Sequence, residues 1–320
     1  MLIQFLILAA GLILILMGAN WLVDGSTSIA RKTGMSEFVI GLTIVGIGTS
    51  APEMVVSFIS SLQGKSDMAI GNVIGSNIFN TFMILGVTAL ISPLIITKDN
   101  LRRDLPLNLF VTLLLIGLGM KNTLFGFGAD EISRLNGALL LGIFILYMWR
   151  SFKYGKEEGE SEEANEEVSH STGISVLMIL GGLLGLVIGG RLFVNSAVKI
   201  AEALHLSEKI IAITIMAAGT SLPELATCIV AARKGKGQLA LGNIVGSNIS
   251  NIILILGGAA LINPLSFSGI STIDVLAILI AAVAVFTSAF TFKKGYIDWK
   301  DGTIFLLLQL SYMAILLANG

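Results

Sequence analysis

Charged side chains are scarce in this chain of 320 residues: Asp, Glu, Lys and Arg make up 13% of it, against 54% hydrophobic residues. A soluble domain carries about 25% charged residues, so the composition excludes an ordinary soluble protein. The net charge of −1 gives no overall attraction to nucleic acid. The single cysteine, Cys228, excludes an internal disulfide, and we expect it to be a small apolar residue on a helix face. No Lys or Arg precedes the first apolar run, although a cleaved signal peptide normally has them, so we expect that run to remain as a membrane helix.

Long apolar runs take the place of the missing charge. A membrane-spanning helix needs about 20 predominantly apolar residues, and on this basis we predict an all-α membrane protein with ten transmembrane helices. The expected spans lie near 2–23, 38–62, 68–91, 105–120, 132–149, 174–197, 210–232, 239–262, 273–292 and 302–318. The second, third, seventh and eighth are rich in Gly, Ser, Thr and Asn at their centres. We therefore expect these four helices to carry the function.

The Lys and Arg residues are distributed unevenly over the predicted loops. The loops after odd-numbered helices hold 14 of them and the opposite side holds 6. Since cytoplasmic loops carry the excess of positive residues, we predict that the loops after odd-numbered helices are cytoplasmic and that both termini lie outside. The protein is then expected in the cell inner (plasma) membrane, in contact with the lipid bilayer and with no obligate protein partner.

One polar stretch interrupts the apolar pattern, at residues 151–172. It carries seven glutamates between positions 157 and 167, and such a charge run is usually solvated and disordered. We interpret it as an acidic cytoplasmic linker between residues 1–150 and 173–320, with a weak cation-attracting or regulatory loop as the alternative.

The most unusual stretch has the pattern Gly-Thr-Ser-x-Pro-Glu and lies at 48–53 in the middle of the second run. It returns 171 residues later at 219–224, within the seventh run. An acid inside a membrane is costly and is by default a candidate functional residue. Two such acids, Glu53 and Glu224, occur in matching contexts. We therefore expect the rest of the chain to bring these two side chains together.

An internal repeat surrounds both copies of this pattern. With a fixed offset of 171 and no gaps, residues 40–86 match residues 211–257 at 21 of 47 positions. The pattern Gly-Asn-x-x-Gly-Ser-Asn-Ile-x-Asn at 71–80 also returns, at 242–251. Each half has five predicted spans, and an odd number places the second half upside down. We therefore predict two inverted five-helix repeats, an arrangement of secondary transporters that puts the substrate site at the midplane.

Proline explains why the second and seventh helices should be broken. Pro52 and Pro223 each remove a backbone donor and push away the carbonyl four residues earlier. The freed carbonyls need new partners inside a membrane, and a bound cation is one. Hydroxyl oxygens lie beside them in the sequence, on Thr49, Ser50, Thr220 and Ser221.

A plainer interpretation exists for the same residues. Ser-x-x-Glu is also a capping box, in which Ser50 caps the helix and Glu53 reaches back to the backbone; Ser221 and Glu224 repeat it. A cap does not require a charge, because Gln would serve as well, so we favour the ion site.

The second repeated pattern adds more oxygen atoms. Ser76 and Asn80 stand four residues apart, as do Ser247 and Asn251, so each pair shares a helix face. We expect the other asparagines, at 72, 77, 243 and 248, to break helices or to form interhelical hydrogen bonds. The glycines at 71, 75, 242 and 246 fit close helix packing.

Every strong candidate ligand is an oxygen atom, since neither His nor Cys belongs to either pattern. Oxygen ligands favour hard cations over zinc, copper or iron. Calcium takes 6–8 oxygen ligands from carboxylates, carbonyls and hydroxyls, and sodium accepts the same atoms. Two carboxylates balance one divalent ion or two and more monovalent ions, which is a physical basis for exchange.

At this point the paired motifs resemble the two alpha-repeats of the calcium/cation antiporter superfamily, and most closely those of its prokaryotic sodium/calcium exchanger group. The resemblance covers nearly the whole chain. It implies that Glu53 and Glu224 bind both calcium and sodium, and that helices one and six slide across the core to alternate access. It further implies the following supporting ligands: the hydroxyls of Thr49, Ser50, Ser76, Thr220, Ser221 and Ser247, and the carbonyls of Gly46 and Ala217.

One position departs from part of that family. Some relatives, including potassium-dependent ones, carry Asp where this chain has Asn251, which matches Asn80. We therefore expect an electrogenic, potassium-independent exchanger of sodium for calcium that needs no cofactor. A proton-coupled exchanger of calcium or another divalent ion is the alternative, since both glutamates can titrate. A channel is disfavoured by the repeat, and an enzyme by the lack of a nucleophile–base set.

Overall fold

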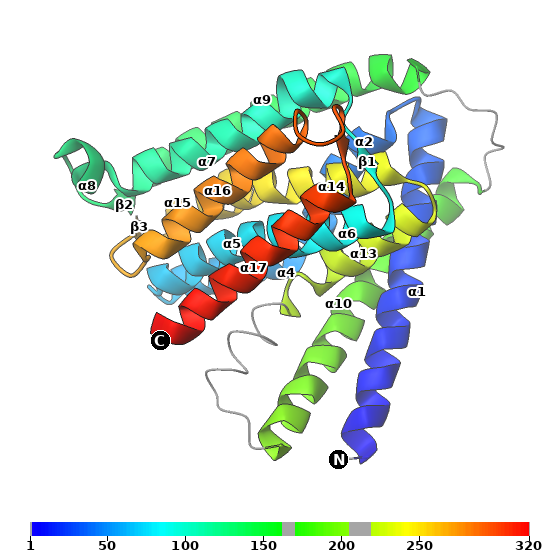
Figure 1. Cartoon of the computed structure of the whole chain (residues 1–320), viewed down its shortest axis with the longest axis horizontal. Helices are drawn as coiled ribbons and strands as arrows, with labels where there is room; N and C mark the ends of the chain where they lie inside the picture. Colours follow the sequence, from blue (N-terminus) through cyan, green and yellow to red (C-terminus); the bar gives the residue numbers. More distant parts are fainter. Residues whose placement is uncertain (1, 162–169, 205–218, 320) are drawn as a thin grey trace.

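The computed structural model describes residues 2–161, 170–204 and 219–319, and it is a bundle of helices with four two-residue strands (Figure 1). The first half contains α1 (Leu2–Thr33), α2 (Glu37–Ile40), the π-helical turn η1 (Gly41–Val45), α3 (Gly46–Thr49), α4 (Ala51–Leu62), α5 (Ser66–Phe79), the π-helical turn η2 (Asn80–Leu85), α6 (Gly86–Ile91), β1 (Leu94–Ile95), the π-helical turn η3 (Asn100–Asp104), α7 (Leu105–Gly119), α8 (Lys121–Phe125), β2 (Glu131–Ile132) and α9 (Arg134–Ser161). The second half contains α10 (Thr172–Ala203), α13 (Leu222–Arg233), α14 (Gly237–Ser250), the π-helical turn η5 (Asn251–Leu256), α15 (Gly257–Ile262), β3 (Leu265–Ser266), α16 (Thr272–Ser288), β4 (Tyr296–Ile297) and α17 (Trp299–Asn319).

Six of these helical stretches are long and apolar enough to cross a membrane, or seven if the bent pair 37–49 and 51–62 is one span. The prediction of an all-α membrane protein is thereby confirmed. The other three expected spans correspond to shorter helices, namely α7 with 15 residues, α13 with 12 and α16 with 17. The first part of the seventh expected span falls on residues 205–218, outside the described part of the chain.

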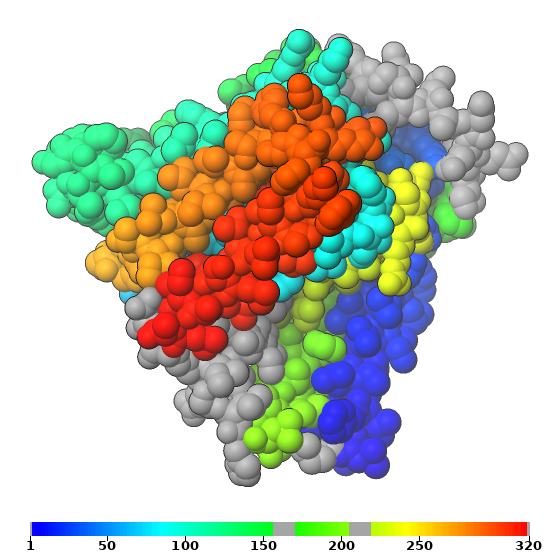
Figure 2. All heavy atoms as spheres, viewed as in Figure 1, coloured from blue at the N-terminus to red at the C-terminus, as the bar shows by residue number. Residues whose placement is uncertain are grey.

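The polar helices lie at the centre of the bundle. In the stretch Gly237–Ile262, 83% of the most apolar window is buried inside the protein, and in Ser66–Ile91 the share is 67%, against 22% for α1, α9 and α17. Figure 2 shows α16 and α17 covering one face of the bundle. The Ser and Asn side chains of α5 and α14 are therefore enclosed by apolar helices.

The helix α9 continues beyond the span that its apolar run predicts. It ends at Ser161 rather than near residue 149, so the expectation of a disordered linker is wrong for residues 151–161. Hydropathy marks only the part of a helix that lies in lipid, and it says nothing of turns that continue into water. Here Lys153 lies over the Trp149 ring, 5.2 Å from its centroid, a contact one helical turn apart that stabilises the extension. The glutamates at 162–167 lie outside the described residues.

The 171-residue offset of the sequence repeat also relates the helix boundaries. Ala51–Leu62 and Leu222–Arg233 differ by 171 at both ends. The same shift carries α5 onto α14, η2 onto η5 and α6 onto α15. Short antiparallel ladders connect the halves, with Leu94 opposite Ile297 in β1–β4 and Ile132 opposite Leu265 in β2–β3.

The two longest helices, α1 and α10, touch through glycine and run side by side away from the rest of the bundle (Figure 1). A Cβ atom added to Gly18 would stand 2.7 Å from the Gly182 carbonyl oxygen, and one added to Gly182 would meet the Gly18 oxygen at the same distance. Gly11 and Gly189 form a second such pair, at 2.9 and 2.8 Å. The backbones are in direct contact, as small residues permit in membrane helices.

Candidate ion-binding site

The first acid sits at a break in the second span. The helix α3 ends at Thr49, Ser50 leaves helical geometry with ψ near 10°, and α4 begins at Ala51 with Pro52 in its first turn. The two parts are bent by 48°. This is the predicted effect of proline, which cannot donate a hydrogen bond to the preceding turn. Glu53 thus enters the first turn of a new helix at the centre of the bundle, where it is only 1% exposed.

The second acid has the same local setting. Pro223 and Glu224 lie in the first turn of α13, and Glu224 is also 1% exposed. Both acids therefore stand in the first turn of a helix, at the positive end of its dipole. The part of the predicted break before Gly219, including Ala217, lies outside the described residues.

The two serines of the acid motifs do not cap their own helices. Neither Ser50 nor Ser221 makes a side-chain capping hydrogen bond. Instead Ser50 Oγ donates to Oε1 of Glu224 at 2.9 Å, and Ser221 Oγ donates to Oε1 of Glu53 at 3.2 Å. The capping interpretation is therefore wrong, and each carboxylate is held by the break of the opposite half.

An asparagine network surrounds the second pair of predicted ligands. Asn80 and Asn251 open the π-helical turns η2 and η5, a distortion that is frequent at functional sites. Asn80 Nδ2 donates to Oδ1 of Asn248 at 3.2 Å, and Asn251 Nδ2 donates to Oδ1 of Asn77 at 3.0 Å. With each amide nitrogen engaged in this way, the remaining oxygen of Asn80 and of Asn251 is left to accept.

Four buried oxygens in this region have no hydrogen-bond partner within the described part of the chain. They are Oε2 of Glu53, Oε2 of Glu224, Oδ1 of Asn80 and Oδ1 of Asn251. An unsatisfied buried acceptor costs about 1–3 kcal/mol, and more when it is charged. All four are acceptors and two belong to carboxyl groups, so a cation is the chemical partner that would satisfy them together.

The remaining predicted ligands are buried or partly buried around the two acids. Ser76 Oγ donates to Glu53 at 3.4 Å, and Thr220 also lies beside this carboxylate. Ser247 Oγ donates to the Gly46 carbonyl at 3.1 Å. Thr49 lies beside Glu224 and donates to Asn243 Oδ1 at 3.1 Å. The structure thus gathers these predicted residues in one region, and Ala217 alone among them is not described.

The other four asparagines, at 72, 77, 243 and 248, bond between helices. The helices α5 and α14 run unbroken through them, so helix breaking is wrong and interhelical bonding is confirmed for all four. Asn72 Nδ2 donates to the Glu53 carbonyl and to Ser57 Oγ in α4, and Asn77 and Asn248 bond between the two halves. Asn243 donates to Sγ of Cys228 at 3.2 Å, which gives the cysteine a polar partner that we did not expect. The repeat itself was the available signal, because Asn77 and Asn248 occupy matching positions.

Close packing is confirmed for Gly242 and Gly246 and is wrong for Gly71 and Gly75, where an added Cβ atom would meet nothing within 4 Å. A Cβ atom added to Gly242 would collide with the Phe38 carbonyl oxygen, and one added to Gly246 would collide with that of Leu42. These contacts hold α14 against α2 and η1, and thereby fix Ser247 beside the Gly46 carbonyl.

Comparison with known proteins agrees with this picture. The family model described as sodium/calcium exchanger protein matches residues 3–153 and 174–318. The chain is 34% identical to the sodium/calcium exchanger MaX1 of Methanosarcina acetivorans, over 98% of each chain. It is 36% identical to the inner membrane protein YrbG of Escherichia coli, over 82% of this chain and 81% of that one.

A solved structure is similar as well. The sodium-calcium exchanger NCX_Mj, from a crystal soaked with Na⁺ and Ca²⁺, superposes with a TM-score of 0.82 at 33% identity, over 98% of both chains.

Proposed function

This chain belongs to the sodium/calcium exchanger family, a family of multi-pass membrane transporters and not of enzymes, and on that premise we propose that it exchanges sodium for calcium by alternating access. The exchange is electrogenic and independent of potassium. Glu53 and Glu224 are the central ligands of both ions, and Asn80, Asn251 and the surrounding hydroxyls and carbonyls complete the sites.

The four unpartnered oxygens carry this proposal. Two carboxylate and two amide oxygens, all buried, match what calcium takes from proteins, and they come from matching positions in the two halves. Among the described residues no three His, Cys, Asp or Glu side chains come together as a metal site. The site therefore holds a formal charge of −2 and must draw its other ligands from neutral oxygens, a set that suits calcium and sodium alike.

A direct transport measurement tests the proposal. The purified protein is reconstituted into vesicles loaded with sodium, and uptake of radioactive calcium is followed after dilution into sodium-free buffer. We expect rapid uptake that stops when the sodium gradient is dissipated. Gradients of pH and of potassium of the same size serve as controls and should drive little calcium uptake.

Proton-coupled calcium exchange remains the second candidate, because one observation favours it. The Oε2 atom of each glutamate is unpartnered, and such an atom accepts a proton as readily as a cation. In the same vesicles, calcium uptake driven by the pH gradient and not by sodium would select this candidate.

The proposed architecture is two inverted repeats of five spans, residues 1–150 and 173–320, joined by the acidic linker 151–172. The 171-residue offset between helix boundaries and the reciprocal bonds from Ser50 and Ser221 support it. The Lys and Arg count, 14 against 6, supports cytoplasmic odd-numbered loops with both termini outside. The named location of YrbG supports a place in the inner membrane.

Labelling of introduced cysteines tests this orientation. The only native thiol is removed by Cys228→Ala, and Lys65→Cys or Lys98→Cys is then added, since both lysines are exposed. In intact cells we expect a membrane-impermeant maleimide to label the first variant. The second should react only after the membrane is disrupted. The reverse pattern would contradict the predicted orientation.

A further inference from the structure

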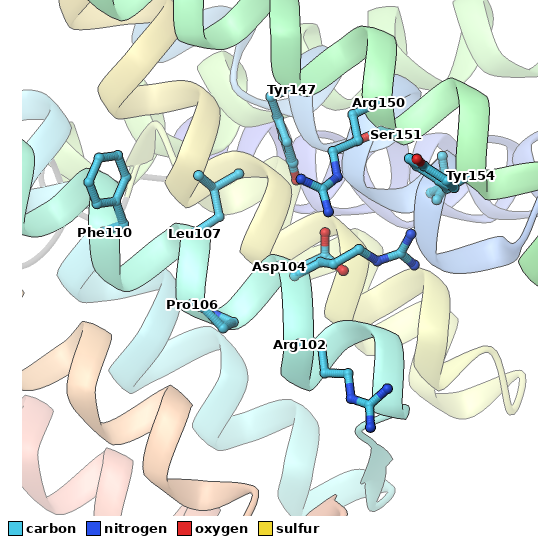
Figure 3. A pocket seen from close by; sticks show the side chains of 11 residues that line it. Arg102, Asp104, Pro106, Leu107, Phe110, Tyr147, Arg150, Ser151 and Tyr154 are labelled. Atoms are coloured by element: carbon cyan, nitrogen blue, oxygen red, sulfur yellow. The ribbon is translucent and has the colours of Figure 1, made fainter.

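A cavity lies away from the ion site, where the start of α7 approaches the end of α9. Its volume is about 280 Å³, and its polar wall is formed by Arg102, Arg103, Asp104, Tyr147, Arg150 and Tyr154 (Figure 3). We call it the arginine pocket. Its arginines belong to loops that we predict to be cytoplasmic, so the pocket lies at the cytoplasmic membrane surface.

Positive charge is concentrated here around a single aromatic ring. The guanidinium carbons of Arg103 and Arg150 lie 5.6 and 5.8 Å from the centroid of the Tyr154 ring, and Lys153 Nζ lies 5.5 Å from it. Arg103 also forms an ion pair with Asp99, with 3.7 Å between Nη2 and Oδ1. Three cations around one ring repel each other, and an anion between them would relieve that repulsion.

One acid faces the same space and has to be counted. Asp104 lies between the arginines, and Figure 3 shows its carboxyl on the same side as the Arg150 guanidinium. Burial raises the pKa of Asp104 to about 7, although Arg103 and Arg150 act in the opposite direction. Even with this carboxylate charged, the wall carries a net positive charge from its three arginines.

A hydroxyl donor is also left over. Tyr147 is 7% exposed, and its hydroxyl lies near the Ser151 side chain without forming a hydrogen bond of good geometry to any described residue. Figure 3 shows the hydroxyl end of the ring directed toward Arg150 and Asp104. An unpartnered buried hydroxyl is a reason to look for a ligand at that point.

The pocket opens along an apolar face of α7. Leu107 and Phe110 line it, and the exposed side chains of Phe110 and Leu113, at 53% and 49%, continue this face one turn further toward the membrane. A free phosphate ion would use only the polar wall, whereas a phospholipid would use both walls, its acyl chain lying on the apolar face.

We propose that the arginine pocket binds the phosphate headgroup of an anionic phospholipid, with guanidinium groups and the Tyr147 hydroxyl as donors. Basic pockets between membrane helices on the cytoplasmic side are suited to such headgroups, and arginine pairs with phosphate through two parallel hydrogen bonds. The site is separate from Glu53 and Glu224 and does not depend on the exchange function.

The test uses the full chain, purified in neutral detergent and titrated with phosphatidylglycerol, phosphatidylcholine or inorganic phosphate. Bound lipid is counted by native mass spectrometry, and the melting temperature is measured at each concentration, because a ligand of the folded state raises it. We expect phosphatidylglycerol to bind and to stabilise at concentrations where the other two do neither.

Variants then locate the site. Tyr147→Phe removes only the hydroxyl and should weaken phosphatidylglycerol binding about fivefold, the effect of one hydrogen bond. Arg102→Gln combined with Arg150→Gln should weaken it about 100-fold, because charge-assisted bonds are lost. The matched control is Lys293→Gln with Lys294→Gln, which removes two exposed charges from another predicted cytoplasmic loop and should bind normally.

Two outcomes would overturn the proposal. One is equal phosphatidylglycerol binding by the arginine variant and the lysine control. The other is stabilisation by inorganic phosphate as strong as that by the lipid, which would make the ligand a free anion.

Discussion

We expect replacement of Glu53 or Glu224 with glutamine to abolish calcium exchange in a protein that still folds and enters the membrane. Glutamine has nearly the same volume and keeps a carbonyl oxygen to accept the hydrogen bonds from Ser221 or Ser50. What it removes is one of the two negative charges that would face the cation in the proposed site. A charge pair 4 Å apart contributes about 4 kcal/mol at an effective dielectric constant of 20, so we expect calcium affinity to fall about 1,000-fold.

The measurement is sodium-driven calcium uptake into vesicles that contain equal amounts of wild-type or variant protein. Glu131→Gln is the matched control, because it makes the same substitution outside the ion site and should leave uptake normal. Thermal melting without calcium provides a folding check, and both site variants should melt at or above the wild-type temperature, since each removes a buried charge. Near-normal uptake by either variant would contradict the assignment of the acids.

Calcium uptake should depend steeply on membrane potential, with an inside-positive potential accelerating sodium-driven entry. The two glutamates provide −2, so one calcium ion brings the site to zero and a third sodium ion brings it to +1. Sodium leaving the vesicle in exchange for calcium then expels net positive charge. One charge crossing 100 mV corresponds to about 2.3 kcal/mol, and this shifts the final calcium accumulation about 50-fold.

A potassium gradient with valinomycin sets the potential in this experiment, and the same gradient without valinomycin is the control. Uptake that is independent of the imposed potential would show that two sodium ions exchange for each calcium. A separate set of vesicles without any potassium tests the significance of Asn251. Uptake should persist there, because the position offers an amide where potassium-dependent relatives carry an acid.

Local chemistry made much of the site predictable. Proline at positions 52 and 223 predicts interrupted helices, and the structure has the first interruption at Ser50 and begins α13 at Leu222. The intramembrane acids were identified because a charge is so costly in lipid. The repeat then indicated that the same elements are built twice, as the matching boundaries of α4 and α13 demonstrate.

Long-range contacts were not predictable in the same way. Ser50 satisfied every local rule for a helix cap, and yet its hydroxyl bonds to Glu224, 174 residues away. Capping competes with any stronger acceptor that tertiary packing brings near, and a carboxylate is such an acceptor. The pairing of Asn251 with Asn77 is of the same kind, since it depends on how α5 and α14 cross.

The ends of some helices could not be predicted from hydropathy. Hydropathy predicts the part of a helix that lies in lipid, so it found the start of α9 and missed its last turns, which continue to Ser161. The π-helical turns η2 and η5 could not be predicted from hydropathy either. They begin at Asn80 and Asn251, which are 171 residues apart, so both halves of the sequence encode the same distortion.

The glycine contacts between α1 and α10 have a consequence for energy conservation. Their backbones touch at Gly18 and Gly182 with no side chain between them, so sliding of either helix along the other would bring side chains against this contact. If these helices carry the access movement, both must travel as one body, and the opening of one entrance is tied to the closing of the other. A conformation open to both sides at once is thereby avoided. Under the proposed function, the sodium gradient would then drive only turnover and would not drain through an uncoupled leak.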